Sequence, residues 1–443
     1  MRIVVIGGDA AGMSAASRAR KYAPDSEVVV YEAGEHVSYS ACGMPFYISG
    51  EVREFVDLIH YPVSKFVQER KIDVQINSRV VRIDKNTKQI TVEREKETFT
   101  DHYDKLIIAT GARARIPEHF TGKKNVFSLR HIDDLPKLEA YMPEVQKVSV
   151  IGAGYVGLEM AEALTRLGKE VTVIQRSDRV LRGMDEEFSS MIIKELEKNK
   201  VVLHLNSPVE GIEEDNGSVT AVIAGKKSIP TDAVFVATGV IPNSELAVET
   251  GIRVSGAGAI VVNERMQTSG PMIYAAGDVA TTRHMVAGKD VYFPLATGSN
   301  KSGRIAGENA AGLRSTYSGI VGTEVVKVFS LEVGKTGLDE KEAKLNKFHP
   351  VSSVITSTSR ASYYPGAAPL KIKLTADEDS HRLIGGILIG KEGVAKRLDI
   401  LATALYCKMK VEDLTRIDYS YSPPFSPAWE PLGVAADVLL GKL

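Results

Sequence analysis

Two segments of the chain each connect a β-branched strand to a second strand through a glycine turn and a helix. The first comprises Arg2–Ile6 and Glu27–Tyr31, and the second comprises Lys147–Ile151 and Glu170–Ile174. A unit of this kind presents backbone N–H groups and the positive end of a helix to a pyrophosphate. Because the chain has two such units, we expect an α/β fold that binds two dinucleotides.

The second glycine turn matches the pattern G-x-G-x-x-G in full, between a strand and a helix. Gly154 lets the backbone approach a pyrophosphate, and Gly157 permits close packing of the helix on the strand. We therefore interpret Gly152–Gly157 as a nucleotide site rather than as a purely structural turn.

The first glycine turn departs from that pattern. Gly7 and Gly12 take the outer positions, but Asp9 stands at the middle position and the glycine is displaced to Gly8. Glu32 lies 20 residues after Gly12 at the end of a strand, where a carboxylate can accept hydrogen bonds from ribose hydroxyls. The sequence favours a nucleotide site here too. The alternative is that Glu32 is an exposed strand-end acid.

Gln175 stands where the second unit would carry its own ribose acid, and Arg176 and Arg179 follow closely. Without a carboxylate at this position a 2′-phosphate is not repelled, and the arginines could hold it. This favours NADPH, or the use of both NADPH and NADH. The alternative is that both arginines are solvated charges at a strand end.

The pattern of the chain changes after about Ser318, where we expect a separate α/β domain of about 120 residues. Val394–Lys408 reads as an amphipathic helix, and Asp418–Trp429 is rich in aromatic residues and proline. Upstream, Val80–Thr100 reads as an inserted β-meander. The strands expected in the last domain are Val325–Phe329, Val351–Ser357, Leu370–Leu374 and Leu383–Ile389.

The 55 Lys and Arg residues balance the 56 Asp and Glu residues, so no global field favours nucleic acid or a membrane. Cys42 and Cys407 are the only cysteines, which excludes a disulfide framework and fits a reducing cytoplasm. We find no signal peptide and no apolar run of about 20 residues. We expect a cytoplasmic protein with no metal centre and no nucleic-acid or membrane partner.

A lone cysteine lies in the segment 38–45, which reads S-Y-S-A-C-G-M-P. Together with G-A-G-Y-V-G-L-E at 152–159 and A-A-G-D at 275–278, it resembles the single-cysteine pyridine nucleotide–disulfide oxidoreductases. That family includes NADH oxidases, NADH peroxidases and coenzyme A-disulfide reductases, and the resemblance covers essentially the whole chain. It implies FAD on the first unit, NAD(P)H on the second, and a homodimer.

The resemblance also implies a domain plan and a set of cofactor residues. It predicts two Rossmann-like domains, for FAD (1–112 and 245–318) and for NAD(P)H (113–244), and a dimerisation domain (319–443). The residues expected to bind FAD are Gly7, Gly8, Gly12, Glu32, Thr110, Gly111, Gly277, Asp278, Ala296 and Thr297. Those expected to bind NAD(P)H are Gly152, Gly154, Tyr155, Gly157, Glu159, Gln175, Arg176 and Gly239.

Tyr155 resembles the family tyrosine that covers the nicotinamide pocket until NAD(P)H displaces it, and Glu159 resembles a glutamate near that pocket. Both could equally be helix-packing residues.

Two departures from family patterns narrow the choice among the branches of the family. Two-cysteine members carry C-x4-C, but this chain has Tyr47 five positions after Cys42, so Cys42 has no internal partner. The oxidases and peroxidases typically carry a histidine in the first turn, where this chain has Ala10. Because that histidine assists peroxide chemistry, its absence argues against a dedicated peroxidase.

The C-terminal tyrosines are similar to those of coenzyme A-disulfide reductases. In that branch two tyrosines of the partner subunit face the cysteine, and they fall on Tyr363 and Tyr421, with aromatic packing at a dimer interface as the alternative. The residues expected to bind coenzyme A are Ser14, Arg18, Lys21, Ser38 and Asn300, although Arg18 and Lys21 could instead form a solvated helix face.

The resemblance implies NAD(P)H-dependent reduction of coenzyme A disulfide, with Cys42 alternating between a thiolate and a mixed disulfide. The alternatives are an NADH oxidase that uses a Cys42 sulfenic acid, a polysulfide or persulfide reductase, and a flavin-binding redox sensor with little turnover. We expect Cys407, on an apolar helix, to be a small buried hydrophobe.

Overall fold

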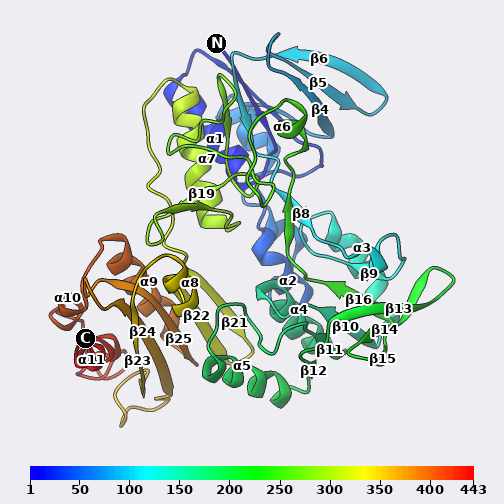
Figure 1. Ribbon diagram of the computed structural model, residues 1–443. Coiled ribbons are helices and arrows are strands. Elements are labelled where there is room, and N and C mark those ends of the chain that lie inside the picture. The colour runs from blue at the N-terminus through cyan, green and yellow to red at the C-terminus, as the bar shows by residue number, and fades with distance from the viewer.

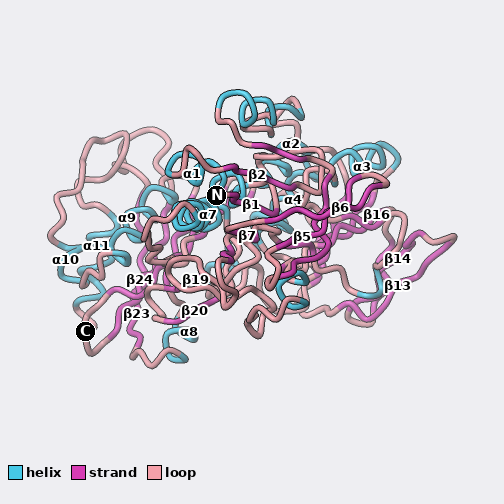
Figure 2. Tube along the Cα trace, turned by 90° about the horizontal axis from the view of Figure 1, so that it is seen from above, coloured by secondary structure: helices cyan, strands magenta, loops and turns pink.

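The first unit is built on a parallel five-stranded sheet, in a computed structural model that describes residues 1–443. The order of its strands is β18 (Ile273–Ala275), β7 (Lys105–Ile108), β1 (Arg2–Ile6), β2 (Glu27–Tyr31) and β3 (Asp73–Gln75). Helices α1 (Ala10–Tyr22) and α7 (Ala296–Ala310) pack side by side next to it, as Figures 1 and 2 show. The β-meander is present as β4 (Ser78–Asp84), β5 (Gln89–Arg94) and β6 (Glu97–His102).

The second unit repeats this plan. Its parallel sheet has the order β12 (Val202–His204), β11 (Glu170–Ile174), β10 (Lys147–Ile151), β16 (Ala233–Val236) and β9 (Val126–Phe127). Its helices are α3 (Asp134–Tyr141), α4 (Tyr155–Arg166) and α5 (Glu186–Lys198). An antiparallel sheet follows, formed by β13 (Val209–Asp215), β14 (Ser218–Ala224) and β15 (Lys227–Pro230).

The C-terminal part folds around an antiparallel sheet. The order of its strands is β21 (Glu324–Val328), β22 (Leu331–Gly337), β25 (Leu383–Gly390), β24 (Pro369–Asp377) and β23 (Pro350–Thr358). Its helices are α8 (Glu340–Leu345), α9 (Val394–Tyr406), α10 (Val411–Thr415) and α11 (Pro431–Leu440). None of the helices in the structure combines the length and apolar character needed to cross a lipid bilayer.

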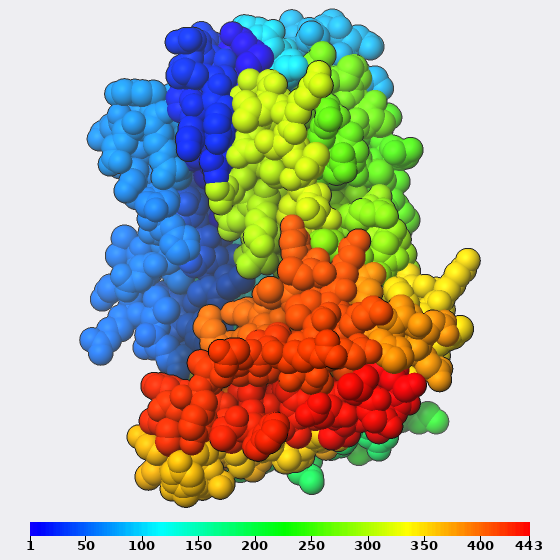
Figure 3. Space-filling view, turned by 90° about the vertical axis from the view of Figure 1, so that its left-hand side faces the viewer, coloured from blue at the N-terminus to red at the C-terminus, as the bar shows by residue number.

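Short elements connect these three parts. Strands β8 (Ala112–Ala114) and β17 (Val240–Pro242) pair where the chain passes between the first two units. After β17 the chain returns to the first unit. This part of the chain contains helix α6 (Glu245–Glu249) and the hairpin of β19 (Thr282–His284) and β20 (Lys289–Val291). Helix α2 (Met44–Ile48) lies near the centre of Figure 1, where it packs against α4. In Figure 3, α1 and α7 lie at the surface above the C-terminal part.

The structure confirms the predicted α/β fold class and the main expected strands and helices. Strand β22 and helix α11 were not predicted, because β22 is almost wholly buried and lacks alternation, and α11 follows a Pro-rich stretch. The prediction for Cys407 is wrong: it lies at the C-cap of α9 and is exposed. The apolar face of α9 ends at Leu405, so the next turn points toward solvent.

Close packing of α1 against α7 depends on two glycines of α7. A Cβ at Gly303 would lie 2.3 Å from the carbonyl oxygen of Ala11, and one at Gly307 would lie 2.1 Å from that of Ala15. We predict that Gly307→Ala lowers the free energy of unfolding by about 1–3 kcal/mol, because the helices must separate. Gly298→Ala is the control, since its nearest neighbours are 3.8 Å away. Urea unfolding measures both, and equal effects would contradict the prediction.

Candidate active site

The first glycine turn lies at the carboxyl edge of the first sheet, directly after β1. Gly7 has a φ of +105°, and a Cβ there would come within 2.2 Å of the carbonyl oxygen of Ala109. A Cβ at Gly12 would lie only 1.8 Å from the carbonyl oxygen of Gly7, so a side chain at either position would separate β1 from α1 or β7. At Gly7, Gly8 and Gly12 the turn therefore presents backbone alone, next to the start of α1.

Glu32 is a buried acid and not the exposed strand-end residue of the alternative interpretation. Its side chain is 8% exposed and accepts hydrogen bonds from the backbone N–H of Gly8 at 2.6 Å and of Gly34 at 2.7 Å. Each carboxylate oxygen keeps a lone pair for a further donor. The carboxylate therefore fixes the glycine turn and remains able to accept from a ribose hydroxyl.

The other residues expected to bind FAD lie along the same sheet edge. Thr110 and Gly111 follow β7, Gly277 and Asp278 follow β18, and Ala296 and Thr297 begin α7. Thr110 donates to the carbonyl of Asn243 at 2.6 Å. Asp278 accepts from Ser299 at 2.6 Å and pairs with Arg130. A Cβ at Gly111 would meet no atom within 4 Å.

This arrangement fits a dinucleotide such as FAD. The donor set combines backbone N–H groups at a helix start, a ribose acceptor and open space at Gly111, which are the features that a pyrophosphate and a ribose require.

The second glycine turn has the same geometry after β10. Gly152 has a φ of +104° and faces the carbonyl oxygen of Ala237, while Gly157 packs on the carbonyl oxygen of Gly152. In contrast, a Cβ at Gly154 or Gly239 would meet no atom within 4 Å. The turn therefore packs tightly on its inner side and is open on its outer side, as a bound pyrophosphate requires.

Gln175 organises the loop that follows β11. Its side-chain oxygen accepts from the N–H of Ala153 at 3.3 Å, and its amide nitrogen donates to Ser177 Oγ at 2.7 Å and to the carbonyl of Arg179 at 3.1 Å. A neutral side chain thus takes the position of a ribose acid and ties the phosphate turn to the arginine loop. Arg176 and Arg179 point to solvent, and Arg179 pairs with Asp178 at 3.5 Å.

Cys42 lies in a single helical turn, Ala41–Gly43, directly before α2. The thiol is exposed, yet the surrounding protein removes water from part of its surface, and this desolvation raises the pKa of Cys42. The charges of Glu159 and Asp278 raise the pKa further, and the charge of Arg130 lowers it. Arg130 is therefore the cation that favours the thiolate.

Two carboxyl groups near the cysteine titrate close to neutrality. Burial raises the pKa of Asp9 to about 6, although the carboxylate accepts a 3.3 Å hydrogen bond from the N–H of Tyr39. Burial and the charge of Glu162 raise the pKa of Glu159 to about 7. Both groups can therefore hold or release a proton beside Cys42 at physiological pH.

Of the residues expected to bind coenzyme A, Ser14, Arg18 and Lys21 lie on α1, Asn300 lies on α7, and Ser38 lies in the loop after β2. Ser14 donates to Asn300 Oδ1 at 2.8 Å, so these two predicted residues are in contact. Arg18 pairs with Glu308 at 3.4 Å, whereas Lys21 is exposed. Ser38 has a φ of +53°, and its N–H donates to the carbonyl of Gly8 at 2.9 Å. On α1, the charge of Arg18 is thus balanced by Glu308 of α7, whereas the charge of Lys21 is exposed to solvent.

The sequence interpretation missed a second group of cations beside α1. Arg70 donates to Ser17 at 2.7 Å, and its guanidinium lies 5.1 Å from the ring of Tyr61. Lys65 lies 4.6 Å from the same ring, and Lys21 lies 5.4 Å from the ring of Tyr22. We define the basic–aromatic cluster as Arg18, Lys21, Tyr22, Tyr61, Lys65 and Arg70. Periodicity could not have found it, because its two halves are about 40 residues apart in the chain.

Tyr363 and Tyr421 lie on neighbouring loops of the C-terminal part and are 74% and 52% exposed. The two loops are joined by a hydrogen bond from the N–H of Ala361 to the carbonyl of Pro423, and a hydrogen bond to Tyr421 raises the pKa of Tyr363. Phe425 and Trp429 are also exposed. The two segments 361–364 and 421–429 thus carry four exposed large aromatic side chains, of the kind that protein interfaces bury.

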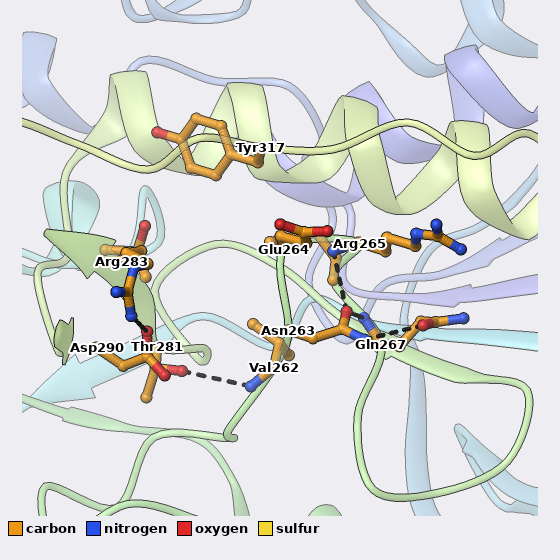
Figure 4. A pocket seen from close by; sticks show the side chains of 11 residues that line it. Val262, Asn263, Glu264, Arg265, Gln267, Thr281, Arg283, Asp290 and Tyr317 are labelled. Carbon is orange, nitrogen blue, oxygen red and sulfur yellow. Dashed lines mark hydrogen bonds and ion pairs between the residues drawn. The ribbon is translucent and has the colours of Figure 1, made fainter. Parts of the chain in front are cut away.

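A cavity of about 590 Å³ lies elsewhere in the first unit, and none of its lining residues was predicted as a site residue (Figure 4). Arg283 pairs with Asp290 at 3.7 Å on one side, Glu264 lies opposite them, and Tyr317 lies above both (Figure 4). None of its lining residues is among the charged groups around Cys42, so the cavity is separate from that site.

Comparison with known proteins decides the family. A model of the pyridine nucleotide-disulphide oxidoreductases matches residues 1–306, and a model of the dimerisation domain of the same family matches residues 323–432. This chain belongs to the pyridine nucleotide-disulphide oxidoreductase family. The predicted family and enzyme class are thereby confirmed. Its members use FAD and NAD(P)H, and the C-terminal part is the dimerisation domain.

Individual relatives extend over nearly the full chain. An NAD(P)H sulfur oxidoreductase (CoA-dependent) of Pyrococcus abyssi is 39% identical, with 99% of this chain and 98% of the relative covered. A coenzyme A disulfide reductase of Staphylococcus aureus is 32% identical, with 96% of each chain covered.

Two solved structures share the fold. A NAD-dependent persulfide reductase from A. fulgidus is 37% identical, with a TM-score of 0.97, covering 100% of this chain and 83% of that chain. An engineered water-forming NADPH oxidase bound to NADPH is 28% identical, with a TM-score of 0.95. The match covers 100% of this chain and 99% of that chain.

The charge of Glu159 predicts how substitution of this residue changes the reactivity of Cys42. In a Cys407→Ser background, Glu159→Gln removes a negative charge that disfavours the thiolate, so the pKa of Cys42 falls. We expect alkylation of Cys42 at pH 8 to become about threefold faster. Asp9→Asn serves as a comparison and should change the rate less, because the charge of Asp9 contributes least to the raised pKa. Rates of iodoacetamide alkylation from pH 6 to 10 test this, and a slower reaction in Glu159→Gln would contradict it.

Proposed function

We propose that this protein uses NAD(P)H to reduce coenzyme A disulfide, or a related persulfide of coenzyme A, through FAD and Cys42. The observation that carries the proposal is the isolation of Cys42. Cys407, the other cysteine, is exposed at the end of α9 in the dimerisation domain, and Tyr47 takes the place of an internal partner. A disulfide exchanged at Cys42 therefore takes its second sulfur from another molecule, and we propose that this molecule is coenzyme A.

The relatives support this substrate class. The Pyrococcus abyssi protein is described as CoA-dependent, the Staphylococcus aureus protein as a coenzyme A disulfide reductase, and the A. fulgidus protein as a persulfide reductase. All three act on sulfur compounds, which agrees with an exposed single thiol.

In this proposal the first unit, 1–112 with 245–318, holds FAD through Gly7–Gly12, Glu32, Thr110–Gly111 and the start of α7. The second unit, 113–244, holds NAD(P)H through Gly152–Gly157. Bound there, FAD would supply the two-electron chemistry that links oxidation of NAD(P)H to reduction of a mixed disulfide. Both glycine turns follow a central strand, β1 or β10, at the carboxyl edge of its sheet, where they would hold the two dinucleotides.

The chemistry at Cys42 is thiol–disulfide exchange. The thiolate attacks one sulfur of coenzyme A disulfide, one coenzyme A leaves as a thiolate, and a Cys42–coenzyme A mixed disulfide forms without a change in overall oxidation state. Arg130 favours the attacking thiolate, and Glu159, with a pKa near 7, can donate a proton to the departing thiolate.

Coenzyme A would lie between the basic–aromatic cluster and the cysteine. Its phosphates meet the free cations of the cluster, and Ser14, Ser38 and Asn300 offer polar contacts nearer Cys42. We propose a homodimer through domain 319–443, in which Tyr363 and Tyr421 of one copy face Cys42 of the other. Their exposure supports this, because phenols that are free in one chain are available to a second one.

An NADH oxidase that reduces O2 to water or peroxide, with a Cys42 sulfenic acid, is the second candidate. The structural likeness to the water-forming oxidase favours it. However, Ala10 begins α1 at the position where that branch typically carries a histidine, so no imidazole is available there.

We predict that Cys42→Ser retains FAD but lowers coenzyme A disulfide-dependent NADPH oxidation by about a thousandfold or more, because it removes the nucleophile. Cys407→Ser is the matched control and should retain turnover. NADPH absorbance and flavin content measure the outcome. Turnover in Cys42→Ser at the unsubstituted rate would refute the proposal.

Mass spectrometry of the native protein distinguishes the two candidate functions. A coenzyme A adduct on Cys42 that is lost on reduction supports disulfide reduction. A sulfenic or sulfinic acid without any adduct supports the oxidase.

We propose that NADPH is the preferred electron donor. The substitutions of the engineered NADPH oxidase remove an aspartate, place arginine and serine at the next two positions, and add a second arginine six residues after the first. This chain has Gln175, Arg176, Ser177 and Arg182 in the same order and spacing. Both arginines are exposed, and neither forms an ion pair in the structure, so both are free to meet a 2′-phosphate.

We expect Arg176→Ala and Arg182→Ala each to lower kcat/KM for NADPH about tenfold while leaving kcat/KM for NADH nearly unchanged, because only NADPH carries the 2′-phosphate. Lys198→Ala, on α5 of the same unit, should change neither value. Steady-state kinetics with both donors test this, and parallel losses with NADH and NADPH would contradict it.

A further inference from the structure

A hydrogen bond joins the nicotinamide-binding unit to the dimerisation domain at the first residue of α4. The hydroxyl of Tyr155 donates to Glu324 Oε2 at 2.7 Å, and Glu324 is the first residue of β21. Burial raises the pKa of both side chains. A hydrogen bond between a phenol and a carboxylate in partly desolvated surroundings is among the stronger kinds in proteins, so it restrains the tyrosine ring.

The rest of the contact between α4 and β21 is fixed independently. Glu162 accepts from Lys327 at 2.7 Å and from the N–H of Phe329 at 2.5 Å. Because Tyr155 and Glu162 are two helical turns apart, they lie on one face of α4 and contact opposite ends of the same strand. Loss of the Tyr155 bond would therefore leave the helix in place and release only the ring.

We propose that Glu324 is a latch that holds Tyr155 across the nicotinamide half of the NAD(P)H site, so that entry of the nicotinamide must break the hydrogen bond. The proposal rests on the proposed function, in which Gly152–Gly157 holds the pyrophosphate of NAD(P)H. Tyr155 directly follows that turn, so a dinucleotide that extends past Gly154 meets its ring.

The latch acts on one half of the ligand only. The adenosine half would lie at Gln175 and Arg176, after β11, where no atom of Tyr155 takes part in the hydrogen bonds of the loop. The hydrogen bond therefore weakens binding of the complete dinucleotide and leaves binding of its adenosine fragment unchanged. Through β21, this gives the dimerisation domain a direct influence on access of NAD(P)H.

Calorimetry of the oxidised, FAD-loaded protein with NADP⁺ and with adenosine 2′,5′-bisphosphate tests the latch. Glu324→Ala and Tyr155→Phe should each bind NADP⁺ about five- to tenfold more tightly, because neither retains the bond. The double variant should bind no more tightly than either single one. Glu324→Gln keeps an acceptor oxygen and should stay within about threefold of the unsubstituted protein. None of these variants should change the affinity for the bisphosphate.

Lys327→Ala is the matched control, because it weakens the same contact between α4 and β21 at its other end. It should leave the affinity for NADP⁺ unchanged. Equal affinities of Glu324→Ala and the unsubstituted protein, or additive effects in the double variant, would overturn the latch. Coenzyme A disulfide turnover is measured separately: a latch variant that binds NADP⁺ as expected in a protein without such turnover would refute the proposed function and leave the latch standing.

Discussion

The packing of α2 against α4 holds Cys42 between the two nucleotide-binding units. Met44 and Ile48 of α2 are buried in the same apolar cluster as Leu158 and Ala161 of α4. Cys42 directly precedes α2, so burying this short helix also fixes the thiol. Because close-packed interiors deform little, the distance between the thiol and both glycine turns is set by this contact.

The charges around Cys42 give the site its chemical character. Glu159, Asp278 and Asp9 all disfavour the thiolate, while Arg130 favours it and is itself held by Asp278. A thiol with a raised pKa is mostly protonated at neutral pH and is therefore a weak nucleophile. Two of the carboxyl groups, those of Asp9 and Glu159, titrate near neutrality. Protonation of Asp9 or Glu159 removes a negative charge that disfavours the thiolate, and so lowers the pKa of Cys42.

Much of the fold and of the site follows from local sequence patterns. The glycine turns of both units, the strands that precede them and the helices that follow were predictable, since each depends on residues within about 30 positions. Strand β22 was missed because nearly all of its residues are buried, which removes the alternation that marks a strand. The exposure of Cys407 was missed because α9 ends at Tyr406, directly after its last buried residue, Leu405, so Cys407 at the C-cap lies beyond the apolar face.

The sequence alone determined the family, the two dinucleotide sites and the absence of an internal partner for Cys42. Only the tertiary structure decided that Glu32 is buried against Gly8, that Gln175 ties the phosphate turn to the arginine loop, and that Arg70 joins Lys21 beside α1. It also decided that Tyr155 is bound by Glu324, 169 residues away. The physical reason is that a turn is specified by backbone preferences of neighbouring residues, whereas these contacts exist only after separate elements pack together.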